Sequence, residues 1–300
     1  MESIGVIGLE HMGGDMAARW LAAGYTVYGT TRSRARAQWL VEHGLRPLDT
    51  PRAIAEAVDV IVTSLPDDCV LESVASGPDG ILAGLRAGKV WLDMSTVSPD
   101  GSRELAARAR ERGAEMLDAP VSGTVPQVQA GTPTIMIGGD EEACRRVEPV
   151  LRVLGTPRRI GEHGQALVLK LAINISLAVQ MLAFSEGLLL ADREGIDLQL
   201  AAEVMAESAI GSPMLKARVP LVLDTPDAAW FDIAQMHRDI RLALATAHEL
   251  DVPLPSAGVA DDVLAGATTL GYQRRDIAAI YGVLARLAEP PCHGALPVDA

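Results

Sequence analysis

Residues 1–160 alternate short apolar runs with amphipathic segments that are rich in alanine and arginine. The expected strands are Ile4–Gly8, Thr26–Tyr28, Asp59–Leu65, Val90–Met94, Glu115–Leu117 and Thr134–Ile137. The expected helices are Met12–Ala23, Arg34–His43 and Pro99–Gly113. Short strands that alternate with helices form βαβ units, which build a parallel, doubly wound sheet. The pattern therefore predicts an α/β domain at the start of the chain.

The residues after Gly164 have a different character, because strand-like runs give way to long helical stretches. These stretches are interrupted at Gly195, Gly211–Pro213, Pro220, Pro226, Pro253–Pro255 and Gly271. Glycine and proline at such spacing mark the ends of helices. We predict three parts: an α/β domain over residues 1–162, a long connecting helix over 163–193, and an all-α domain over 194–300.

The segment Ala166–Ala191 has the length and the apolar character of a membrane span. It nevertheless carries Lys170, Asn174, Gln180, Ser185 and Glu186. Polar groups of this kind are costly to transfer into lipid. We therefore expect a buried helix, and no membrane partner.

Composition argues against several classes of protein. The 300 residues are 49% hydrophobic and carry a formal net charge of −13, whereas a nucleic-acid-binding domain usually presents a basic face. The three cysteines, Cys69, Cys144 and Cys292, form no Cys-x-x-Cys pair, so neither a disulfide framework nor a metal site is expected. The N-terminus lacks the pattern of a signal peptide, and a cytoplasmic location is expected.

The segment Gly8-Leu9-Glu10-His11-Met12-Gly13 occupies the predicted turn between the first strand and the first helix. A dinucleotide-binding turn of the Rossmann type has the spacing G-x-G-x-x-G and holds the pyrophosphate at the helix N-terminus. Gly8 and Gly13 fit this spacing, whereas Glu10 replaces the middle glycine. An ordinary glycine-containing turn is the alternative, but the position at the start of an α/β pattern favours a cofactor site over residues 8–13.

The second strand is followed by Gly29-Thr30-Thr31-Arg32-Ser33-Arg34, which contains no carboxylate. NAD-binding enzymes place Asp or Glu about 20 residues after the glycine turn, where it binds the ribose hydroxyls. Arginine instead offers a fork of donors that suits a 2′-phosphate. We predict that Thr31 and Arg32 bind NADP(H), with NAD as the alternative cofactor. The non-functional alternative for this segment is a solvent-exposed start of the next helix.

Lys170 and Asn174 lie four residues apart in the predicted connecting helix, so they project from one face. Only three of the 26 basic residues are lysines, and Lys170 is the one inside this apolar helix. A partly buried lysine can release its proton near neutral pH, whereas arginine cannot. Oxidation of an alcohol needs a base for the hydroxyl proton, and reduction needs the same group as an acid. The alternative is a structural lysine whose ammonium reaches solvent.

Five motifs follow one another along essentially the whole chain. They are Ile7–Gly13, Leu92–Pro99, Asp118–Gly123, Gly161–Gly164 leading to Lys170 and Asn174, and His237–Asp239. In this order they resemble the β-hydroxyacid dehydrogenase family, which includes 3-hydroxyisobutyrate dehydrogenase and is related to 6-phosphogluconate dehydrogenase. The resemblance implies an oxidoreductase that moves a hydride between NADP(H) and a small β-hydroxy acid or semialdehyde. It also implies a homodimer or homotetramer.

The resemblance implies roles for the substrate site. Lys170 would be the general acid/base, and Asn174 would hold the substrate and orient the lysine. Ser122 and Gly123 would bind a small carboxylate substrate through a hydroxyl and a backbone N–H. The alternative for Ser122 and Gly123 is an ordinary turn at the end of a strand.

The resemblance also extends the cofactor site beyond the glycine turn. Leu65, Pro66 and Thr96 would line its nicotinamide half, and Arg238 would lie near both cofactor and substrate. The alternative for Thr96 is a structural place beside the cap of the helix that starts at Pro99.

The chain departs from the family pattern at four positions. Glu10 replaces the second glycine of the cofactor turn, and Thr124 follows Gly123 where many members have a further glycine. Ala166 replaces a common glycine before Lys170, and Arg238 replaces a lysine while keeping its charge.

Two other functions remain as alternatives. Imine reductases share the implied architecture but generally lack the lysine, so Lys170 argues against that activity. A nucleotide-binding scaffold protein without turnover is favoured by Glu10, but Ser122, Lys170 and Asn174 together oppose it.

Overall fold

The structure, a computed structural model, describes residues 2–10, 12–31, 34–123 and 125–288. Its contacts divide the chain into an N-terminal unit, Met1–Ile173 with His248–Leu250, and a C-terminal unit, Asn174–Ala247 with Asp251–Ala300. The division falls inside one long helix. The boundaries that we predict at 162 and 193 are not tested by this division and stay predictions.

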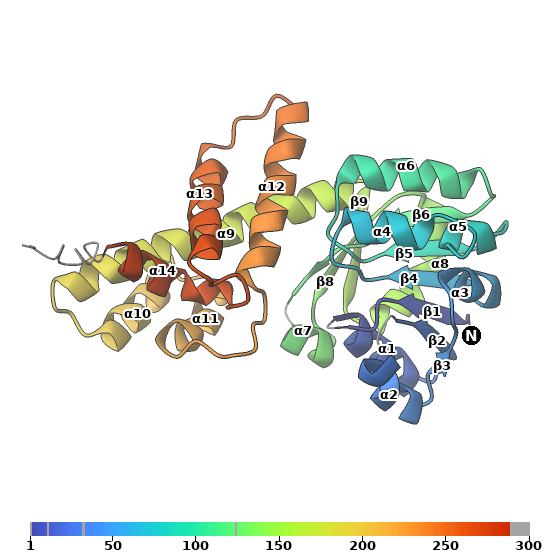
Figure 1. The fold of residues 1–300 in the computed structure, drawn as a ribbon, viewed down its shortest axis with the longest axis horizontal. Helices are drawn as coiled ribbons and strands as arrows, with labels where there is room; N and C mark the ends of the chain where they lie inside the picture. The colour runs from blue at the N-terminus through green and yellow to red at the C-terminus, as the bar shows by residue number, and fades with distance from the viewer. Residues whose placement is uncertain (1, 11, 32–33, 124, 289–300) are drawn as a thin grey trace, which may run out of the picture. The chain divides into compact units, whose positions relative to one another are not determined.

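The N-terminal unit is built on one nine-stranded sheet with the order β3-β2-β1-β4-β5-β6-β8-β7, in which β9 also pairs with β8 (Figure 1). The strands are β1 (Ile4–Ile7), β2 (Val27–Thr30), β3 (Arg46–Pro47), β4 (Val60–Thr63), β5 (Val90–Asp93), β6 (Glu115–Asp118), β7 (Val121–Ser122), β8 (Thr134–Gly138) and β9 (Thr156–Gly161). From β3 to β6 all neighbours are parallel. The predicted doubly wound α/β fold is therefore confirmed.

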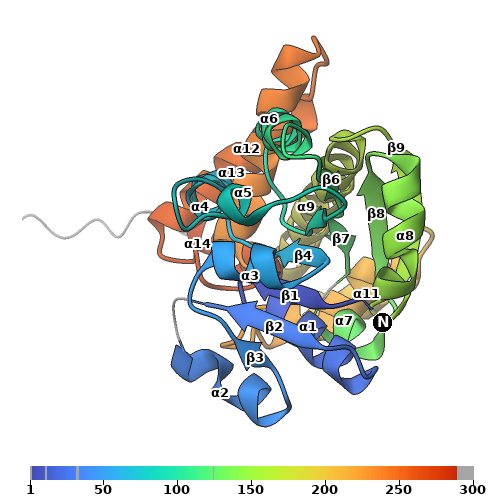
Figure 2. The same ribbon diagram turned by 90° about the vertical axis from the view of Figure 1, so that its right-hand side faces the viewer.

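Helices cover both faces of this sheet (Figure 2). They are α1 (Met12–Ala22), α2 (Arg34–Glu42), α3 (Pro51–Ala57), α4 (Asp68–Ala75), α5 (Ile81–Gly84), α6 (Pro99–Arg110), α7 (Val125–Ala130) and α8 (Glu141–Arg152). One apolar cluster joins the sheet to α1, α2 and α8, and a second joins its other face to α3, α4, α5 and α6. The two clusters explain why the central strands read as continuous apolar runs: both of their faces are buried.

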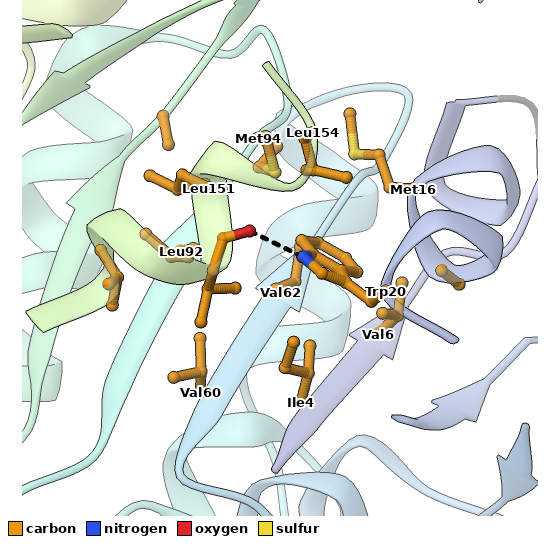
Figure 3. Packing of buried hydrophobic residues seen from close by; sticks show 14 of the residues in the cluster. Ile4, Val6, Met16, Trp20, Val60, Val62, Leu92, Met94, Leu151 and Leu154 are labelled. Atoms are coloured by element: carbon orange, nitrogen blue, oxygen red, sulfur yellow. Dashed lines mark hydrogen bonds between the residues drawn. The ribbon is translucent and has the colours of Figure 1, made fainter. Parts of the chain in front are cut away.

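Trp20 of α1 is a central side chain of the first cluster (Figure 3). It is fully buried against the face of the sheet that carries Ile4 and Val6. Its indole Nε1 donates a hydrogen bond of 2.9 Å to the carbonyl oxygen of Val150 in α8. This bond satisfies the one polar atom of the side chain and ties the first helix of the unit to the last helix before β9.

The far half of the sheet is mixed. Strand β8 pairs antiparallel with β6 and β7, and parallel with β9. The alternating sequence pattern predicts parallel strands throughout. This prediction is wrong for β8, which runs antiparallel to β6 and β7. The antiparallel pairing places residues of β6 and β7 in fixed register against one strand.

The C-terminal unit is all-helical, as predicted. The chain forms α9 (Gln165–Arg193), which begins in the N-terminal unit, then α10 (Leu198–Glu207), α11 (Pro213–Leu223), α12 (Ile233–Glu249), α13 (Pro255–Thr269), a 3₁₀ turn (Ile277–Ala279) and α14 (Ile280–Leu287). Asp197 and Ser212 cap α10 and α11 by accepting hydrogen bonds from Leu200 N and Leu215 N. Pro220, which we expect to interrupt a helix, lies inside α11.

Helix α9 has the length and composition of a membrane-spanning helix. The same features are found in core helices of globular proteins. In the C-terminal unit the buried side chains of α9, among them Met181, Phe184 and Leu188, belong to the apolar core of that unit. This packing gives α9 a protein partner along one side.

Candidate active site

The turn after β1 has the steric features of a dinucleotide-binding loop. Gly8 has φ +96°, and a Cβ on it would lie 2.3 Å from the carbonyl oxygen of Ser64. A Cβ on Gly13 would lie 1.9 Å from the carbonyl oxygen of Gly8. Only glycine is tolerated at either position, because both contacts are with backbone atoms. The turn therefore keeps strand and helix in close contact, which is the arrangement in which a helix N-terminus can receive a phosphate.

The other residues of this turn differ in burial. Leu9 is buried, Glu10 is half-buried, and Met12 begins α1. His11 lies outside the described residues. Nothing in the backbone requires glycine at position 10 in the way that positions 8 and 13 require it, which explains how the turn accepts a glutamate.

The region after β2 is described only in part. Thr31 follows the last residue of β2 directly, and β2 pairs in parallel with β1. Arg32, the predicted 2′-phosphate ligand, lies outside the described residues. The location of Thr31 at the same sheet edge as Gly8 fits the predicted site, and the phosphate contact of Arg32 stays a prediction.

A buried hydrogen-bond network connects the ends of β4 and β5. Asp93 Oδ1 accepts hydrogen bonds from Thr63 Oγ1 (2.7 Å), Ser95 Oγ (2.6 Å) and Ser95 N (3.2 Å). Ser95 Oγ in turn accepts a hydrogen bond from Leu65 N, and Thr63 Oγ1 accepts one from Trp91 Nε1, both at 2.9 Å. The network holds the segments after both strands, where Leu65, Pro66 and Thr96 lie.

The carboxyl group of Asp93 is fully buried, and its Oδ2 has no hydrogen-bond partner among the described residues. Burial raises the pKa of Asp93 to about 6, against the stabilising hydrogen bonds of Ser95 and Thr63. The neighbouring carboxylate of Asp118 acts in the same direction as burial. A charge with one unpartnered oxygen is therefore held beside the predicted nicotinamide segments.

The switch point of the sheet lies between β1 and β4, because the chain runs from β1 to β2 on one side and then to β4 on the other. Ligands of open α/β sheets bind outside the carboxyl ends of the strands at such a point. Gly8, Leu65 and Pro66 follow β1 and β4 at this edge, and Thr96 follows β5. The structure thus brings together the predicted cofactor residues of the N-terminal unit that it describes.

Ser122 ends β7, where it is paired with Thr134 of β8, and Gly123 follows it. A Cβ on Gly123 would lie 2.7 Å from Cβ of Pro133, so a glycine is favoured there. Both residues are half-buried. The hydroxyl of Ser122 and the N–H of Gly123 are the donors that a carboxylate ligand would need at this strand end.

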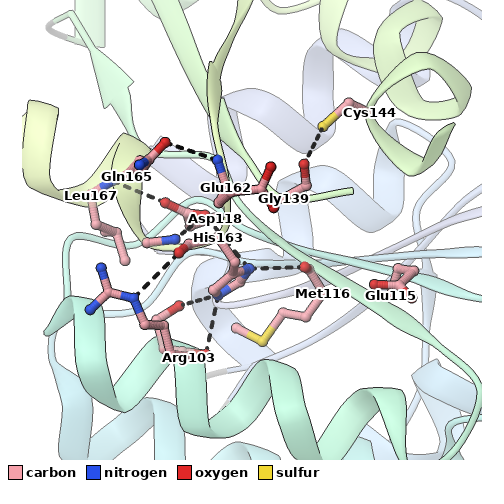
Figure 4. Close-up of polar contacts among 12 residues, drawn as sticks. Arg103, Glu115, Met116, Asp118, Gly139, Cys144, Glu162, His163, Gln165 and Leu167 are labelled. Carbon is pink, nitrogen blue, oxygen red and sulfur yellow. Dashed lines mark hydrogen bonds and ion pairs between the residues drawn. The ribbon is translucent and has the colours of Figure 1, made fainter. Parts of the chain in front are cut away.

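The first turn of α9 is attached to the end of β6 (Figure 4). Asp118 Oδ1 accepts a hydrogen bond from Gly164 N (2.8 Å), and Oδ2 accepts one from Leu167 N (3.0 Å). Room for this carboxylate depends on Gly138 of β8, where a Cβ would lie 2.3 Å from Asp118 Oδ1. Lys170 follows one turn later in α9 and is half-buried.

His163 lies two residues before this helix, and its side chain is 9% exposed (Figure 4). Its Nδ1 lies 3.0 Å from the carbonyl oxygen of Met116, and its Nε2 lies 2.9 Å from Ser102 Oγ of α6. Burial lowers the pKa of His163, although Asp118 opposes the shift. Nε2 also lies 3.1 Å from the carbonyl oxygen of Ser102, so the ring joins β6 to α6 through both of its nitrogen atoms.

In the C-terminal unit, a chain of polar contacts connects α9 and α12. The buried Asn174 donates from Nδ2 to Asp239 Oδ2 at 2.7 Å. Asp239 Oδ1 accepts a hydrogen bond from Arg238 Nε at 2.9 Å. Because a carboxylate only accepts, the amide nitrogen of Asn174 faces Asp239 and its carbonyl oxygen is turned away. Asn174 and Arg238, predicted on separate grounds, are thus joined through Asp239.

No group of three or more His, Cys, Asp or Glu side chains with the arrangement of a metal site occurs in the described ranges of the chain.

Comparison with known proteins identifies the family. Residues 3–167 match the family described as the NAD-binding domain of 6-phosphogluconate dehydrogenase. Residues 164–284 match that described as NAD-binding of NADP-dependent 3-hydroxyisobutyrate dehydrogenase. The chain belongs to the β-hydroxyacid dehydrogenase family. It is an NAD(P)-dependent dehydrogenase that acts on the CH–OH group of hydroxy acids.

Individual members of the β-hydroxyacid dehydrogenase family match over nearly the whole chain. The 2-(hydroxymethyl)glutarate dehydrogenase of Eubacterium barkeri is 34% identical over 93% of this chain and 94% of that protein. The solved structure of Mycobacterium tuberculosis 3-hydroxyisobutyrate dehydrogenase with L-serine is 28% identical, with a TM-score of 0.84 over 95% of this chain and 99% of that one. An imine reductase from Myxococcus stipitatus is 23% identical with a TM-score of 0.65, which shows a shared fold alone.

Four residues of this β-hydroxyacid dehydrogenase with buried polar contacts were not singled out by sequence reasoning. They are Asp93, Asp118, His163 and Asp239. Each lies inside one of the five motifs. An aspartate as the last residue of an apolar strand, as at positions 93 and 118, is the signal that identifies two of them, because a charge at such a place needs a specific partner.

Proposed function

We propose that this enzyme transfers a hydride between NADP(H) and a small β-hydroxy acid, with Lys170 as general acid/base. The observation that supports it most is the lysine's place in the second turn of α9, in the unit that carries the glycine turn and Ser122. Lys170 is half-buried within this apolar helix. The same place on the chain is predicted independently from the scarcity of lysine and from the motif.

The nicotinamide ring, when bound, accepts or supplies the hydride. In oxidation, neutral Lys170 takes the hydroxyl proton at Nζ, and in reduction the ammonium returns it to the carbonyl oxygen. Ser122 and the N–H of Gly123 bind the substrate carboxylate and so fix which carbon faces the ring. Asn174, one helical turn beyond Lys170, offers its carbonyl oxygen as an acceptor that orients the substrate hydroxyl and the lysine.

The substrate class follows from what the names of the relatives share. 2-(Hydroxymethyl)glutarate, 3-hydroxyisobutyrate and L-serine all have the form HOCH2–CHR–COO⁻. A small carboxylate bearing a primary β-hydroxyl is therefore the proposed substrate, or the matching semialdehyde in the reverse direction. Glyoxylate and succinic semialdehyde, whose aldehyde groups lie on the α and γ carbons, are proposed as alternative substrates because another relative is named for their reduction.

The proposed cofactor preference is NADP(H) over NAD(H). It is supported by the absence of a carboxylate from residues 29–34 and by Arg32 and Arg34 in that segment. Titration of the protein with NADPH and NADH, followed by enhanced nicotinamide fluorescence, tests it. Tighter binding of NADH would contradict the preference.

The reaction is tested with a panel of β-hydroxy acids and semialdehydes, with a cyclic imine added for the alternative activity. We expect Lys170→Ala to lower kcat by about a thousandfold, as for removal of a proton-transfer group, while NADPH affinity changes little. Lys216→Ala, in α11, is the matched control and should keep full activity. Turnover retained by Lys170→Ala would refute the role of the lysine, and turnover of the imine alone would favour the alternative.

We also propose a homodimer or homotetramer in the cytoplasm. Leu200 and Val204 of α10, four residues apart, are 55% and 58% exposed. Apolar side chains on one helix face are typical of subunit contacts. Sedimentation equilibrium gives the subunit number, and a monomer at micromolar concentration would contradict this assignment.

A further inference from the structure

The carboxylate of Asp118 makes an unusual helix cap. The first N–H groups of a helix have no partner within it, and the side chain of the residue just before the helix usually accepts from one of them. In α9 the acceptor comes instead from the end of β6, 46 residues before Gly164. Both oxygens are used, one on Gly164 N and one on Leu167 N (Figure 4). The cap thus fixes both the distance of the helix from the strand and its rotation.

Strand pairing also connects Asp118 to the predicted carboxylate-binding residues. Asp118 is paired with Gly138 of β8, and Ser122 is paired with Thr134 of the same strand. Strand β8 therefore holds Asp118 and Ser122 in a fixed register, with Gly123 directly after. On the helix, Lys170 lies three residues beyond Leu167, which is about 4.5 Å along the axis and on nearly the same face.

His163 supports the position of the strand that carries Asp118. Its ring bridges Met116 of β6 and Ser102 of α6, and its Nδ1 lies 3.6 Å from Asp118 Oδ1. The carboxylate of Asp118 faces the positive end of the α9 dipole through its contacts with Gly164 N and Leu167 N. The contact with the helix is therefore charge-assisted, and a neutral side chain of equal size would not reproduce it.

We propose that Asp118 is a positioning residue for hydride transfer, which sets Lys170 at the correct place relative to Ser122 and Gly123. The inference rests on the proposed role of Lys170. Both oxygens of Asp118 are bound to the start of α9, so it acts through Gly164 and Leu167 on one side and through the β8 register on the other. A small displacement of a proton-transfer group is enough to lower a rate by up to about a hundredfold.

The test replaces the cap with a side chain of equal size. Asp118→Asn keeps one acceptor and places an amide donor against the N–H of Gly164 or Leu167. We expect kcat, measured per NADPH-binding site, to fall about ten- to a hundredfold with the best substrate of the panel. Substrate KM should change less than about threefold, because Ser122 and Gly123 remain, and the Kd of NADPH should stay within about twofold. A purely structural role would lower the melting temperature and the number of NADPH sites but not kcat per site.

The matched control is Asp140→Ala. Asp140 caps α8 in the same unit by accepting a hydrogen bond of 2.8 Å from Ala143 N, and α8 carries no predicted site residue. This variant should lose thermal stability while keeping kcat per site and KM. If Asp118→Asn does not fold, Asp118→Ser, which keeps a short acceptor without an amide donor, is measured in its place.

Two results separate the possible failures. If Lys170→Ala is inactive but Asp118→Asn, or its serine substitute, has the parent kcat per site, the positioning role is wrong and the role of the lysine stands. If Lys170→Ala retains turnover, the proposed function itself is wrong, whatever the Asp118 variants show.

Discussion

The edge of the sheet where the predicted cofactor and substrate residues lie is built in two opposite ways. After β1 the chain removes side chains: Gly8 and Gly13 let backbone atoms approach to distances that any Cβ would prevent. After β5 and β6 the chain buries charged side chains, Asp93 and Asp118, which are register partners on adjacent strands. The first device depends on shape and leaves position 10 open to change. The second depends on hydrogen-bond partners. The number of hydrogen bonds that each carboxylate oxygen accepts decides how well a substitution of the aspartate is tolerated.

The two aspartates show what partners do to a buried charge. Both oxygens of Asp118 accept N–H groups of a helix start, whereas Asp93 uses one oxygen for three hydrogen bonds, and its other oxygen has no partner among the described residues. Desolvation therefore raises the pKa of Asp93 to about 6. A carboxylate that is shared by two strand ends stabilises the site geometry but opposes folding when it is ionised.

The largest effect is expected at the glycine turn. Gly13→Ala places a Cβ 1.9 Å from the carbonyl oxygen of Gly8, so strand and helix must separate. We expect the free energy of unfolding to fall by about 3 kcal/mol, at the upper end of overpacking effects, and NADPH binding to weaken at least tenfold. Urea unfolding and fluorescence titration measure the two. Gly258→Ala is the control, because a Cβ there meets nothing within 4 Å, and equal effects of both substitutions would contradict the steric argument.

The second effect concerns Asp93. Its folded pKa of about 6 lies above the ordinary value of 3.8, so the folded state binds this proton more tightly than the unfolded state. The contribution of this group to stability is complete below pH 3.8 and is lost as the pH rises through about 6. Asp93→Asn should remove that loss. The free energy of unfolding of the variant minus that of the parent should rise by roughly 2–3 kcal/mol from pH 4 to pH 7.

Urea unfolding at a series of pH values measures this difference. The contributions of the other carboxyl groups to the pH dependence are the same in both proteins and cancel. Gly258→Ala, which changes no titratable group, should show a difference that does not change with pH. If the Asp93→Asn curve runs parallel to that of the parent, Asp93 is ionised in the ordinary range and the contrast with Asp118 fails.

The smallest effect is expected at position 10. Glu10→Gly removes a negative side chain from the turn that is predicted to receive a pyrophosphate, and NADPH should bind several-fold more tightly, which is about 1 kcal/mol. Glu10→Gln separates charge from size, because only the charge is removed. Weaker binding by both variants would show that the glutamate has a positive role in the turn.

The sequence predicts the parallel half of the sheet well, because β1, β4 and β5 are apolar runs buried on both faces. It does not predict β3 or β9. Arg46 and Pro47 are exposed, and Thr156–Gly161 contains two exposed arginines in place of an apolar run. Such strands form because a neighbouring strand offers backbone hydrogen bonds, and the neighbour lies far away in sequence.

The same limit applies to the site. Gly8 and Gly13 are predictable because their spacing is local, and the structure supplies the atoms that require them. The contacts of Asp118 with Gly164 and of Asp93 with Thr63 join segments 46 and 30 residues apart, so only the fold reveals them. The roles of Lys170, Asn174 and Arg32 remain predictions that the experiments above address.

Gly138 has a consequence for how this sequence can change over time. It leaves the space that the Asp118 carboxylate fills, so the two positions are not free to mutate independently. An alanine at 138 would be tolerated only after the residue at 118 had become smaller, and that step removes the cap of α9. An evolutionary route that exchanges this pair passes through a variant with a displaced helix, so selection for turnover would act on 118 and 138 as one unit.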